Sequence, residues 1–552
     1  MKRTFRALPA LLLVLALLLS SCSFTPTQPR EPLPEDTIRE NMAASVPGAA
    51  TVGDYLSTWG LPEYYEQNLA AYEEALGGRF YTGEDTTLAI ARDIGERYLT
   101  TYYHTVSYTD KTSVTAAIQK LYLAALAARE EVKTPAADIA AAAENGTGDA
   151  DVLYSAFYLA RFGVPVFNLD KFMAIESIFR QTYYKPLPSA LALAQSAATT
   201  FAEKLYDTTD LSDTEAVTDA LIRAYVLAVG DKYAAYRTAL QYEIYDTDMS
   251  GSYVGIGVTI QYLYEDGSME VTAVTEGGPA AEAGIRTGDY LFAIDGVPVS
   301  ELGYEGTIAR VRGEVGTEVA VTVSRGADTI TFTMVRRAMT EETVTVTIDD
   351  DNIAYVRITQ FKANTGAQFR AVIDRLETAG VRGVIYDLRG NPGGYVSSVL
   401  NALSYLVPEN TPVISFGSGG GYNAFDNHTF SVPSVVLCNE YTASAGELFT
   451  AAMRDYTAMG LQDAVIVGAV TYKKGIMQST YTLPDKSTLT LTVDTYNPPS
   501  GVNYDGVGIT PDEIVPMTGT GDAQRDRAYE ILRKKLEKNS GGSGIDLPRV
   551  PF

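Results

Sequence analysis

Residues 435–447 read Val-Val-Leu-Cys-Asn-Glu-Tyr-Thr-Ala-Ser-Ala-Gly-Glu, and this stretch decides how the C-terminal half of the chain folds. The apolar start predicts a buried strand, and the residues from Ser444 onward predict a helix. A serine at such a junction projects its hydroxyl at the helix N-terminus, where N–H groups and the macrodipole favour negative charge. Serine is also a common helix N-cap, so this residue alone does not indicate catalysis.

Two further strand-and-helix pairs precede this stretch. Residues 353–358 and 384–388 predict strands, and residues 368–376 and 395–406 predict the helices that follow them. Such alternation is typical of an α/β core. The junction of the second pair reads Asp-Leu-Arg-Gly-Asn-Pro-Gly-Gly and lacks the Gly-Lys-Ser/Thr ending of a phosphate-binding loop.

Two backbone N–H groups are candidate donors to an oxyanion beside Ser444. The N–H of Ala445 lies at the start of the predicted helix, and the glycine-rich loop could bring the N–H of Gly393 to the same point. The competing interpretation of that loop is a simple turn between strand and helix.

A serine hydroxyl needs a base, and the chain contains only two histidines, His104 and His428. His428 lies in a polar stretch typical of a loop. The better candidate is Lys474, in the sequence Tyr-Lys-Lys-Gly-Ile-Met-Gln. On a strand, alternation places Lys474 and Gln478 on one face, so Gln478 can orient the amine or a bound substrate. Lys473 would then point to solvent.

The proposed base must be neutral to accept a proton. The Lys474 amine must therefore lose about three pKa units from its free value near 10.4, or roughly 4 kcal/mol of differential interaction. Burial in an apolar pocket can supply this shift. The hypothesis requires a dry pocket for Lys474 within hydrogen-bonding reach of Ser444.

Residues 251–337 predict a compact β-rich unit with glycine turns. Its first segment, Gly255-Ile256-Gly257-Val258, places two glycines before a strand, where converging N–H groups can bind an anion such as a terminal carboxylate. The adjoining strand edge can accept an extended peptide. The competing interpretation is a small β-barrel whose glycines only make turns.

The region from residue 54 to residue 245 predicts helices and carries no catalytic signal. Residues 63–76 form one such stretch, and Ser212-Asp-Thr-Glu215 is a capping box that opens another. Their apolar stripes are more typical of a core than of a cofactor site. Residues 516–552 predict a terminal helix and tail.

The N-terminus predicts a targeting segment. A basic start precedes an apolar run that is too short to span a bilayer, and small residues lead to Cys22. We therefore predict a lipoprotein signal peptide over residues 1–21, lipidation of Cys22 and a tether over residues 22–53. The competing interpretation is ordinary cleavage, with Cys22 incidental.

Composition excludes several functions. The 552 residues carry a net charge of −25, so the chain would repel phosphate backbones and a nucleic-acid partner is not expected. With two cysteines and two histidines, the sequence lacks zinc-site spacings, and we expect no metal and no cofactor. If Cys22 is lipidated, Cys438 is a lone buried thiol.

Together these motifs resemble the carboxyl-terminal processing proteases, also called tail-specific proteases. The resemblance covers about residues 212–515 and rests on the β-rich unit, which is similar to a PDZ domain, and on four ordered motifs. These are Asp-Leu-Arg-Gly-Asn-Pro-Gly-Gly, Thr-Ala-Ser-Ala-x-Glu, Lys-Gly-x-x-Gln and Gly-Val-Gly-Ile-Thr-Pro-Asp. The resemblance implies a multidomain α+β chain: a helical N-terminal region, a PDZ domain over residues 251–337 and a crotonase-like ββα protease core over residues 340–515.

The resemblance also implies roles by motif position. Ser444 would be the nucleophile and Lys474 the general base, assisted by Gln478. Ala445 and Gly393 would form the oxyanion hole.

The PDZ unit would bind substrate tails and gate the dyad, with an arginine at the position of Arg312 helping in some members. The chain departs from the family pattern in three places. Lys473 replaces the usual glycine, Gly446 stands where serine or alanine is common, and the 30-residue interval from serine to lysine is about five longer than expected. The extra residues fit a loop near residues 459–463.

The sequence therefore predicts a serine endopeptidase, anchored outside the cytoplasm to the bacterial cell membrane, that cleaves unfolded or C-terminal tail segments. Its partners would be protein or peptide substrates and the membrane, and homo-oligomer formation is left open. One alternative is a non-catalytic lipoprotein that binds peptides or assembles partners through its PDZ unit, which the retained serine, lysine and glutamine disfavour. A crotonase-like acyl-CoA enzyme is disfavoured by the secretion signal.

Overall fold

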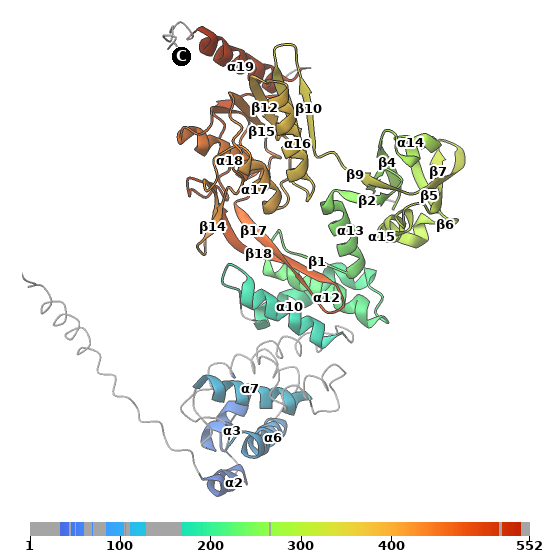
Figure 1. Ribbon diagram of the computed structural model, residues 1–552. Coiled ribbons are helices and arrows are strands. Elements are labelled where there is room, and N and C mark those ends of the chain that lie inside the picture. Colours follow the sequence, from blue (N-terminus) through green and yellow to red (C-terminus); the bar gives the residue numbers. More distant parts are fainter. Residues whose placement is uncertain are drawn as a thin grey trace, which may run out of the picture. The chain divides into compact units, whose positions relative to one another are not determined.

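The computed structural model (Figure 1) divides the chain into two compact units, which are residues 1–177 with 188–229 and residues 178–187 with 230–552. The described residues are 34–43, 46–49, 51–59, 69, 84–103, 105, 111–127, 167–188, 190–263, 267–517 and 521–541. The predicted signal peptide, Cys22 and His104 lie outside the described residues, as does the predicted helix over 63–76 except for Leu69.

The first unit is helical in its described part. It contains α2 (Glu35–Ala43), α3 (Val52–Thr58), α6 (Glu84–Thr101), α7 (Lys111–Ala127), most of α10 (Leu169–Thr182), α11 (Ala190–Thr200) and α12 (Thr214–Val229). These helices pack through apolar faces, for example Leu221 and Tyr225 of α12. The helices predicted for this region are confirmed over these residues.

The predicted tether is wrong from Glu35 onward. Helix α2 buries Ile38 and Met42, which lie one turn apart, and Val52 is buried at the start of α3. A capping box between Thr51 and Asp54 opens α3. The proline- and glutamate-rich composition masked this apolar i, i+4 pair, which packing against neighbouring helices makes sufficient for order.

Residues 251–337 of the second unit form a small β-sheet domain. The strands β3 (Val258–Tyr262), β4 (Met269–Val274), β5 (Tyr290–Ile294), β7 (Glu318–Arg325) and β8 (Asp328–Val335) pair in that order, with β6 (Val297–Pro298) on β5. Helices α14 (Pro279–Ala283) and α15 (Val299–Val311) accompany the sheet, and β2 (Ser252–Gly255) pairs with β9 (Arg337–Thr340) where the chain enters and leaves. Alternate side chains of β7 form the core because successive strand residues face opposite sides.

A six-stranded sheet forms the C-terminal core, with the order β10-β11-β12-β15-β16-β19. Its strands are β10 (Val344–Ile348), β11 (Ile353–Ile358), β12 (Gly383–Asp387), β15 (Ser434–Cys438), β16 (Ala464–Gly468) and β19 (Glu513–Ile514). Only the β10–β11 pair of this sheet is antiparallel. Parallel strands need helices as crossovers, so the predicted alternation of strands and helices is confirmed.

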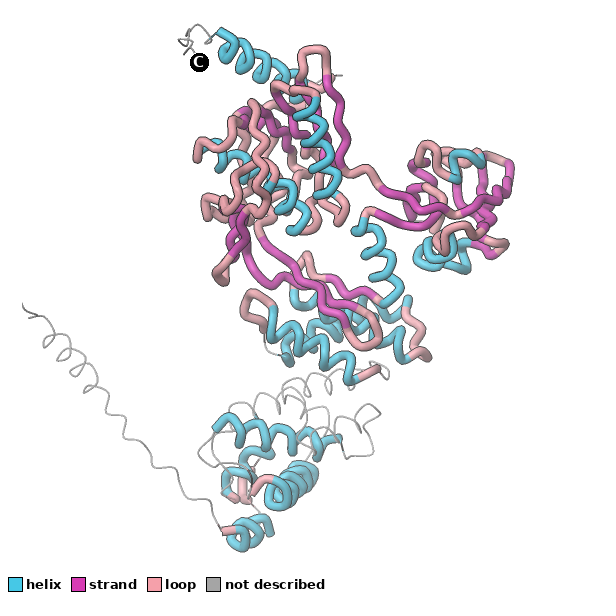
Figure 2. Tube along the Cα trace, viewed as in Figure 1, coloured by secondary structure: helices cyan, strands magenta, loops and turns pink. Residues whose placement is uncertain are grey.

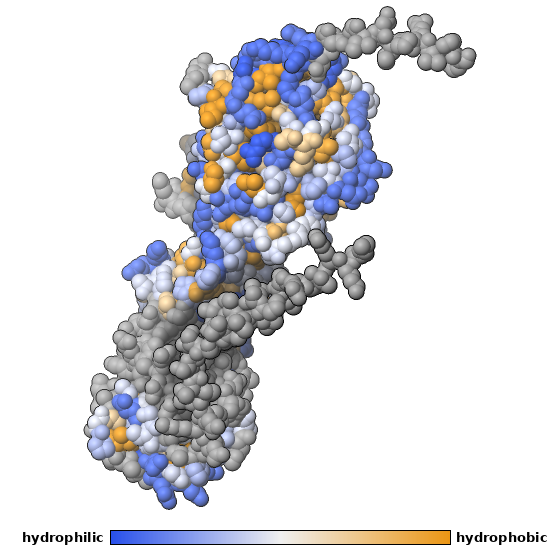
Figure 3. Space-filling view, turned by 90° about the vertical axis from the view of Figure 1, so that its left-hand side faces the viewer, coloured by the Kyte–Doolittle hydropathy of each residue, from blue (hydrophilic) through white to orange (hydrophobic). Residues whose placement is uncertain are grey.

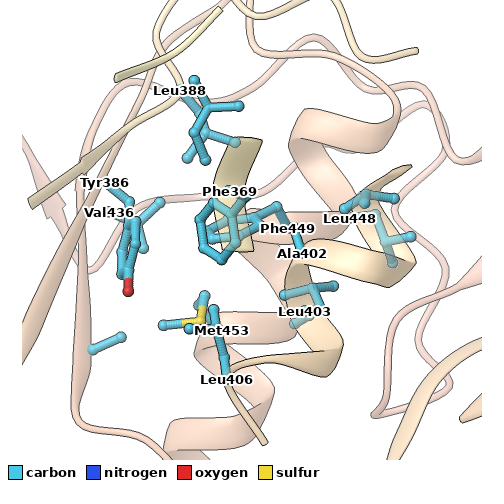
Figure 4. Close-up of a cluster of buried hydrophobic side chains, with 14 of the residues drawn as sticks. Phe369, Tyr386, Leu388, Ala402, Leu403, Leu406, Val436, Leu448, Phe449 and Met453 are labelled. Atoms are coloured by element: carbon cyan, nitrogen blue, oxygen red, sulfur yellow. The ribbon is translucent and has the colours of Figure 1, made fainter. Parts of the chain in front are cut away.

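Helices cover both faces of this sheet (Figure 2). Helices α16 (Thr365–Thr378), α17 (Val396–Ser404) and α18 (Ala445–Ala458) pack on one face, and α19 (Ala523–Gly541) packs on the other. Residues of β12 alternate between the two cores, with Tyr386 facing α18 and Ile385 facing α19. Figure 4 shows the first core, in which Phe449 contacts Phe369 and Tyr386 with ring centroids 6.1 and 5.6 Å apart.

A second sheet of five strands flanks this core. Strands β1 (Ala235–Arg237), β18 (Thr488–Asn497), β13 (Pro412–Phe416) and β14 (Gly421–Asn423) pair in that order, and β17 (Ile476–Thr482) also pairs with β18. The prediction of helix up to residue 245 is therefore wrong at β1. Three residues can join a sheet edge through backbone hydrogen bonds alone, which leaves little trace in a sequence pattern.

No helix among the described residues has both the length and the hydrophobicity needed to span a bilayer. Figure 3 shows one face, where hydrophobic and hydrophilic residues of the described part are interspersed. Exposed large hydrophobic side chains include Tyr441, Tyr472 and Val507, which lie in the loops around the serine and lysine described next.

Candidate active site

Ser444 occupies a strained turn between β15 and α18. Its φ of 52° and ψ of −116° are unusual for a residue with a side chain, at a cost of about 1–3 kcal/mol that the surrounding structure must offset. Gly393 lies against this turn, since a Cβ on it would stand 2.7 Å from the Ser444 Cβ and 2.9 Å from the Ala445 nitrogen. The glycine-rich loop after β12 therefore lies against the serine turn.

The buried carboxylate of Glu447 holds this turn in place. Its Oε2 accepts hydrogen bonds from the backbone N–H of Ser444 at 2.9 Å and of Lys474 at 2.8 Å. Its Oε1 accepts from the N–H of Lys473 at 2.7 Å and from the Thr471 hydroxyl at 2.5 Å. One side chain thus joins the serine segment to the lysine segment.

The sequence argument missed the role of Glu447. A signal was present, because glutamate three residues after a helix-starting serine is the capping-box pattern. The capping-box pattern predicts only one of the hydrogen bonds of Glu447, the one that its carboxylate accepts from the Ser444 N–H. The other donors come from residues 24 to 27 positions later in the chain.

The Lys474 side chain is partly buried, and its amine lies 4.3 Å from the centroid of the Tyr233 ring. Burial lowers the pKa of Lys474 to about 8, against the opposing effects of Asp231 and Glu447. Lys474 is partly buried, so its surroundings favour the neutral amine, as the proposed base would need. Among the described residues no hydrogen bond joins the Lys474 amine to Ser444, and the amine instead lies against the aromatic ring.

The expectation that Lys474 lies on a strand is wrong. Strand β17 begins at Ile476, and Lys473 adopts a φ of 82°, which breaks the extended backbone. The physical reason is Glu447, which takes the N–H groups of residues 473 and 474 that a strand would use. A bulge after Met477 further disturbs the assumed alternation.

Gln478 lies on β17, and its amide donates to the Thr492 hydroxyl at 3.2 Å. Its observed contact is thus with the neighbouring strand β18 rather than with the Lys474 amine. Lys473 is exposed, as expected for a solvated lysine. The His428 ring lies 3.0 Å from the Glu377 carboxylate, in an exposed pair.

The two predicted oxyanion donors differ in this conformation. The N–H of Ala445 opens helix α18, where the first N–H groups have no partner within the helix. The N–H of Gly393 donates to the Asn391 side chain at 2.8 Å, and the Gly393 carbonyl accepts from the Phe361 N–H at 2.8 Å. Of the two predicted donors, the Gly393 N–H is already occupied by the Asn391 side chain. The Ala445 N–H, at the start of α18, is the one that could donate to an anion beside Ser444.

The glycine-rich loop is fixed at its start by an ionic cluster that the sequence argument did not predict. Asp387 is buried at the end of β12 and pairs with Arg357 at 2.9 Å and with Arg389 at 2.8 Å. Burial alone would raise the pKa of Asp387, but hydrogen bonds from Arg389 and Tyr355 lower it. Arg389 also pairs with Asp522 at 2.7 Å, just before α19.

A groove runs along the small β-sheet domain between β3 and α15. All four predicted peptide-binding residues, 255–258, line it, and so do Ile308 and Val311 of α15. Arg312 lines its end, donates to the Ile244 carbonyl at 3.3 Å and lies 6.0 Å from the centroid of the Tyr253 ring. The groove is lined by polar and apolar groups, and the Arg312 guanidinium shares it with the carboxylates of Asp248 and Glu341. A groove beside a strand edge can hold an extended peptide.

The second half of the chain is similar to known protein families. A family model of peptidase family S41 matches residues 352–515, and a model of the PDZ domain matches residues 270–325. A carboxyl-terminal-processing protease of Synechocystis sp. is 31% identical over 309 residues, which cover 53% of this chain and 71% of the relative. One of Picosynechococcus sp. is 32% identical over 318 residues, which cover 55% and 76%. The solved structure of a photosystem II D1 C-terminal processing protease is 25% identical, with a TM-score of 0.38, over 62% of this chain and 91% of that one.

Replacing Glu447 by glutamine tests its role in holding the site together. The amide keeps the shape but turns an NH₂ group toward N–H donors, which leaves buried groups unpaired at about 1–3 kcal/mol each. We expect Glu447→Gln to lower kcat/KM by about 10- to 100-fold and to lower the Tm. Exposed Glu440→Gln on the same loop is the matched control, and wild-type kinetics for Glu447→Gln would contradict the assignment.

Proposed function

The chain belongs to the carboxyl-terminal-processing protease family and is a serine-type peptidase, and from this premise we propose that Ser444 and Lys474 form its catalytic dyad. The observation that supports the pair is the Glu447 carboxylate, which binds the backbone N–H of both residues through one oxygen atom. Glu447 therefore keeps the two segments at a fixed separation. The depressed pKa of Lys474 further supports its role as the base.

The proposed reaction is acyl transfer to water. The Ser444 oxygen attacks the peptide carbonyl, and the neutral Lys474 amine takes the hydroxyl proton. The Ala445 N–H stabilises the resulting oxyanion. Lys474 then gives the proton to the leaving amine, and a water molecule releases the acyl group and restores the Ser444 hydroxyl.

We propose that the Lys474 amine, which lies against the Tyr233 ring, turns from the ring toward Ser444 during the reaction. A cation held over an aromatic ring is stabilised in its charged form, by about 0.5–2 kcal/mol. The observed contact therefore favours the protonated lysine, which is inactive as a base. Deprotonation removes this attraction and frees the four-carbon side chain to turn toward the hydroxyl.

We further propose that the PDZ domain binds the C-terminal tails of unfolded protein substrates. The groove beside residues 255–258 supports this assignment, and so does Arg312 at its end. Because Arg312 also contacts α13 (Ala239–Ser250) outside the PDZ domain, a peptide carboxylate that attracts its guanidinium would compete with that contact. This competition is the proposed gating step. Lipidation of Cys22 would anchor the enzyme at the outer side of the cell membrane.

Active-site variants test the dyad directly. With an unfolded substrate that ends in an apolar tail, we expect Ser444→Ala and Lys474→Met to lose at least 1,000-fold in kcat, because each removes a group that acts in the bond-making step. Lys473→Met is the matched control, since it removes an exposed lysine next in sequence. Equal turnover by Ser444→Ala would remove this serine from the mechanism. No turnover by the wild type on any unfolded substrate would favour a peptide-binding lipoprotein without catalysis.

The pH profile tests the base. Since the pKa of Lys474 is lowered to about 8, only about 1% of the amine is neutral at pH 6, and this fraction rises tenfold per pH unit up to the pKa. We expect kcat/KM to rise with pH and to level off above about pH 8. A profile that is flat between pH 6 and pH 9, with a substrate that does not titrate there, would exclude Lys474 as the base.

Arg312→Met tests the gating step. Loss of the guanidinium should weaken the response to a tail peptide, so we expect the peptide to stimulate labelling of Ser444 by a fluorophosphonate at least threefold less than in the wild type. Arg310→Met, two residues earlier and exposed, is the control. The same stimulation in both variants would show that Arg312 takes no part.

A further inference from the structure

Tyr496 lies at the end of β18 with its side chain 1% exposed. Its hydroxyl donates to the carbonyl oxygen of Lys474 at 3.2 Å. The Ser444 and Tyr504 side chains lie close enough to this hydroxyl to oppose the rise in its pKa that burial causes. A single buried phenol therefore binds the backbone of the proposed base and lies beside the proposed nucleophile.

The position of this hydroxyl is fixed by the backbone around it. The N–H of Tyr496 donates to the Gly475 carbonyl at 3.2 Å, so the residue is tied to the segment that carries Lys474. The Asn503 side chain donates to the carbonyl oxygens of both Gly475 and Tyr496, at 2.9 and 2.7 Å. The Tyr504 ring packs edge-on against the Tyr496 ring, with centroids 6.0 Å apart, and its hydroxyl reaches the Ser444 carbonyl at 3.4 Å.

We propose that Tyr496 is a positioning residue for the reaction, which holds the Ser444 hydroxyl in place for attack and keeps the Lys474 segment beside it. This inference rests on the proposed roles of Ser444 and Lys474. A phenylalanine would fill the same volume, so the contribution specific to tyrosine is its hydroxyl. A buried hydroxyl without a partner is costly, whereas this one donates to the Lys474 carbonyl.

The hydrogen bonds around Tyr496 suit both stages of the attack. Before attack, the phenol donates to the Lys474 carbonyl and its oxygen can accept the Ser444 hydroxyl hydrogen. When the amine takes that hydrogen, the Ser444 oxygen becomes an acceptor, and the phenol can turn its own hydrogen toward it. Burial raises the pKa of Tyr496, so the phenol keeps its hydrogen throughout. The phenol can therefore act as a hydrogen-bond donor or acceptor toward the Ser444 oxygen without losing its own proton.

Tyr456 supplies a matched control within the same domain. It is also fully buried, and its hydroxyl donates to the Pro412 carbonyl at 3.1 Å. Its contacts involve neither Ser444 nor Lys474. A change from tyrosine to phenylalanine thus removes one buried hydroxyl in both cases, and only the variant at residue 496 removes it from the proposed site.

The experiment compares Tyr496→Phe, Tyr504→Phe and Tyr456→Phe with the wild type and with Ser444→Ala. The rate of fluorophosphonate labelling, measured in the absence of a tail peptide, reports on the nucleophile without bound substrate, and kcat and KM are measured on the tail substrate. We expect Tyr496→Phe to lower the labelling rate and kcat by roughly 3- to 12-fold, the equivalent of one neutral hydrogen bond, with an unchanged KM. Tyr504→Phe should give a smaller loss, and Tyr456→Phe should label at the wild-type rate.

The Tm of each variant separates positioning from folding. If the losses follow the Tm values, or if Tyr496→Phe labels as fast as Tyr456→Phe, the proposal is wrong. If Tyr496→Phe does not fold, Tyr504→Phe decides in its place, and a labelling rate equal to that of Tyr456→Phe overturns the proposal. Labelling that persists in Ser444→Ala would instead refute the proposed nucleophile, which is a distinct result.

Discussion

The site depends on one buried negative charge. Glu447 is fully buried, and within the described part of the chain its carboxylate accepts hydrogen bonds from three backbone N–H groups and one hydroxyl rather than pairing with an arginine or lysine side chain. Such a carboxylate is tolerated in a low-dielectric interior only when its acceptor positions are filled. The need to fill these acceptor positions shapes two segments. The Ser444 N–H fills one position, which fixes the strained turn. The N–H groups of Lys473 and Lys474 fill others, which takes the segment before β17 out of strand geometry and holds Lys474 near the start of α18.

The same constraint explains what could be predicted from the sequence. The strands and helices of the core have strong apolar periodicity, so β11, β12, β15 and the helices between them were predictable. Ser444 and Lys474 were found from motifs, and the buried surroundings of the lysine followed from the chemistry it would need. The local backbone at Lys474 was not predictable, because the N–H groups of its segment are satisfied by a residue 27 positions earlier in the chain. Helix α2 and strand β1 were missed for a related reason, since both are ordered by packing or pairing that their own sequences barely signal.

A second buried charge lies where the PDZ domain joins the core. The Lys362 amine is almost completely buried and pairs with Asp248 at 3.0 Å and Glu341 at 2.7 Å, both of which also line the peptide groove. The residue before it, Phe361, binds the Gly393 carbonyl through its N–H. The groove and the glycine-rich loop are therefore connected through a short series of direct contacts. Asp248 and Glu341 lie just before and just after the domain and are partly exposed, so the two ion pairs tie the entry and the exit of the domain to one core lysine.

The close approach of Gly393 to the nucleophile turn sets a limit on how this enzyme can vary. A methyl group there would overlap the serine side chain and two backbone atoms, and the residue's φ of 97° disfavours any other amino acid. Exposed Pro392, next to it, meets no such barrier from burial. Descendants of this chain can therefore change the exposed rim of the loop, while the atom facing the serine must stay a hydrogen. The loop is open to substitution at one residue and closed to it at the neighbouring one.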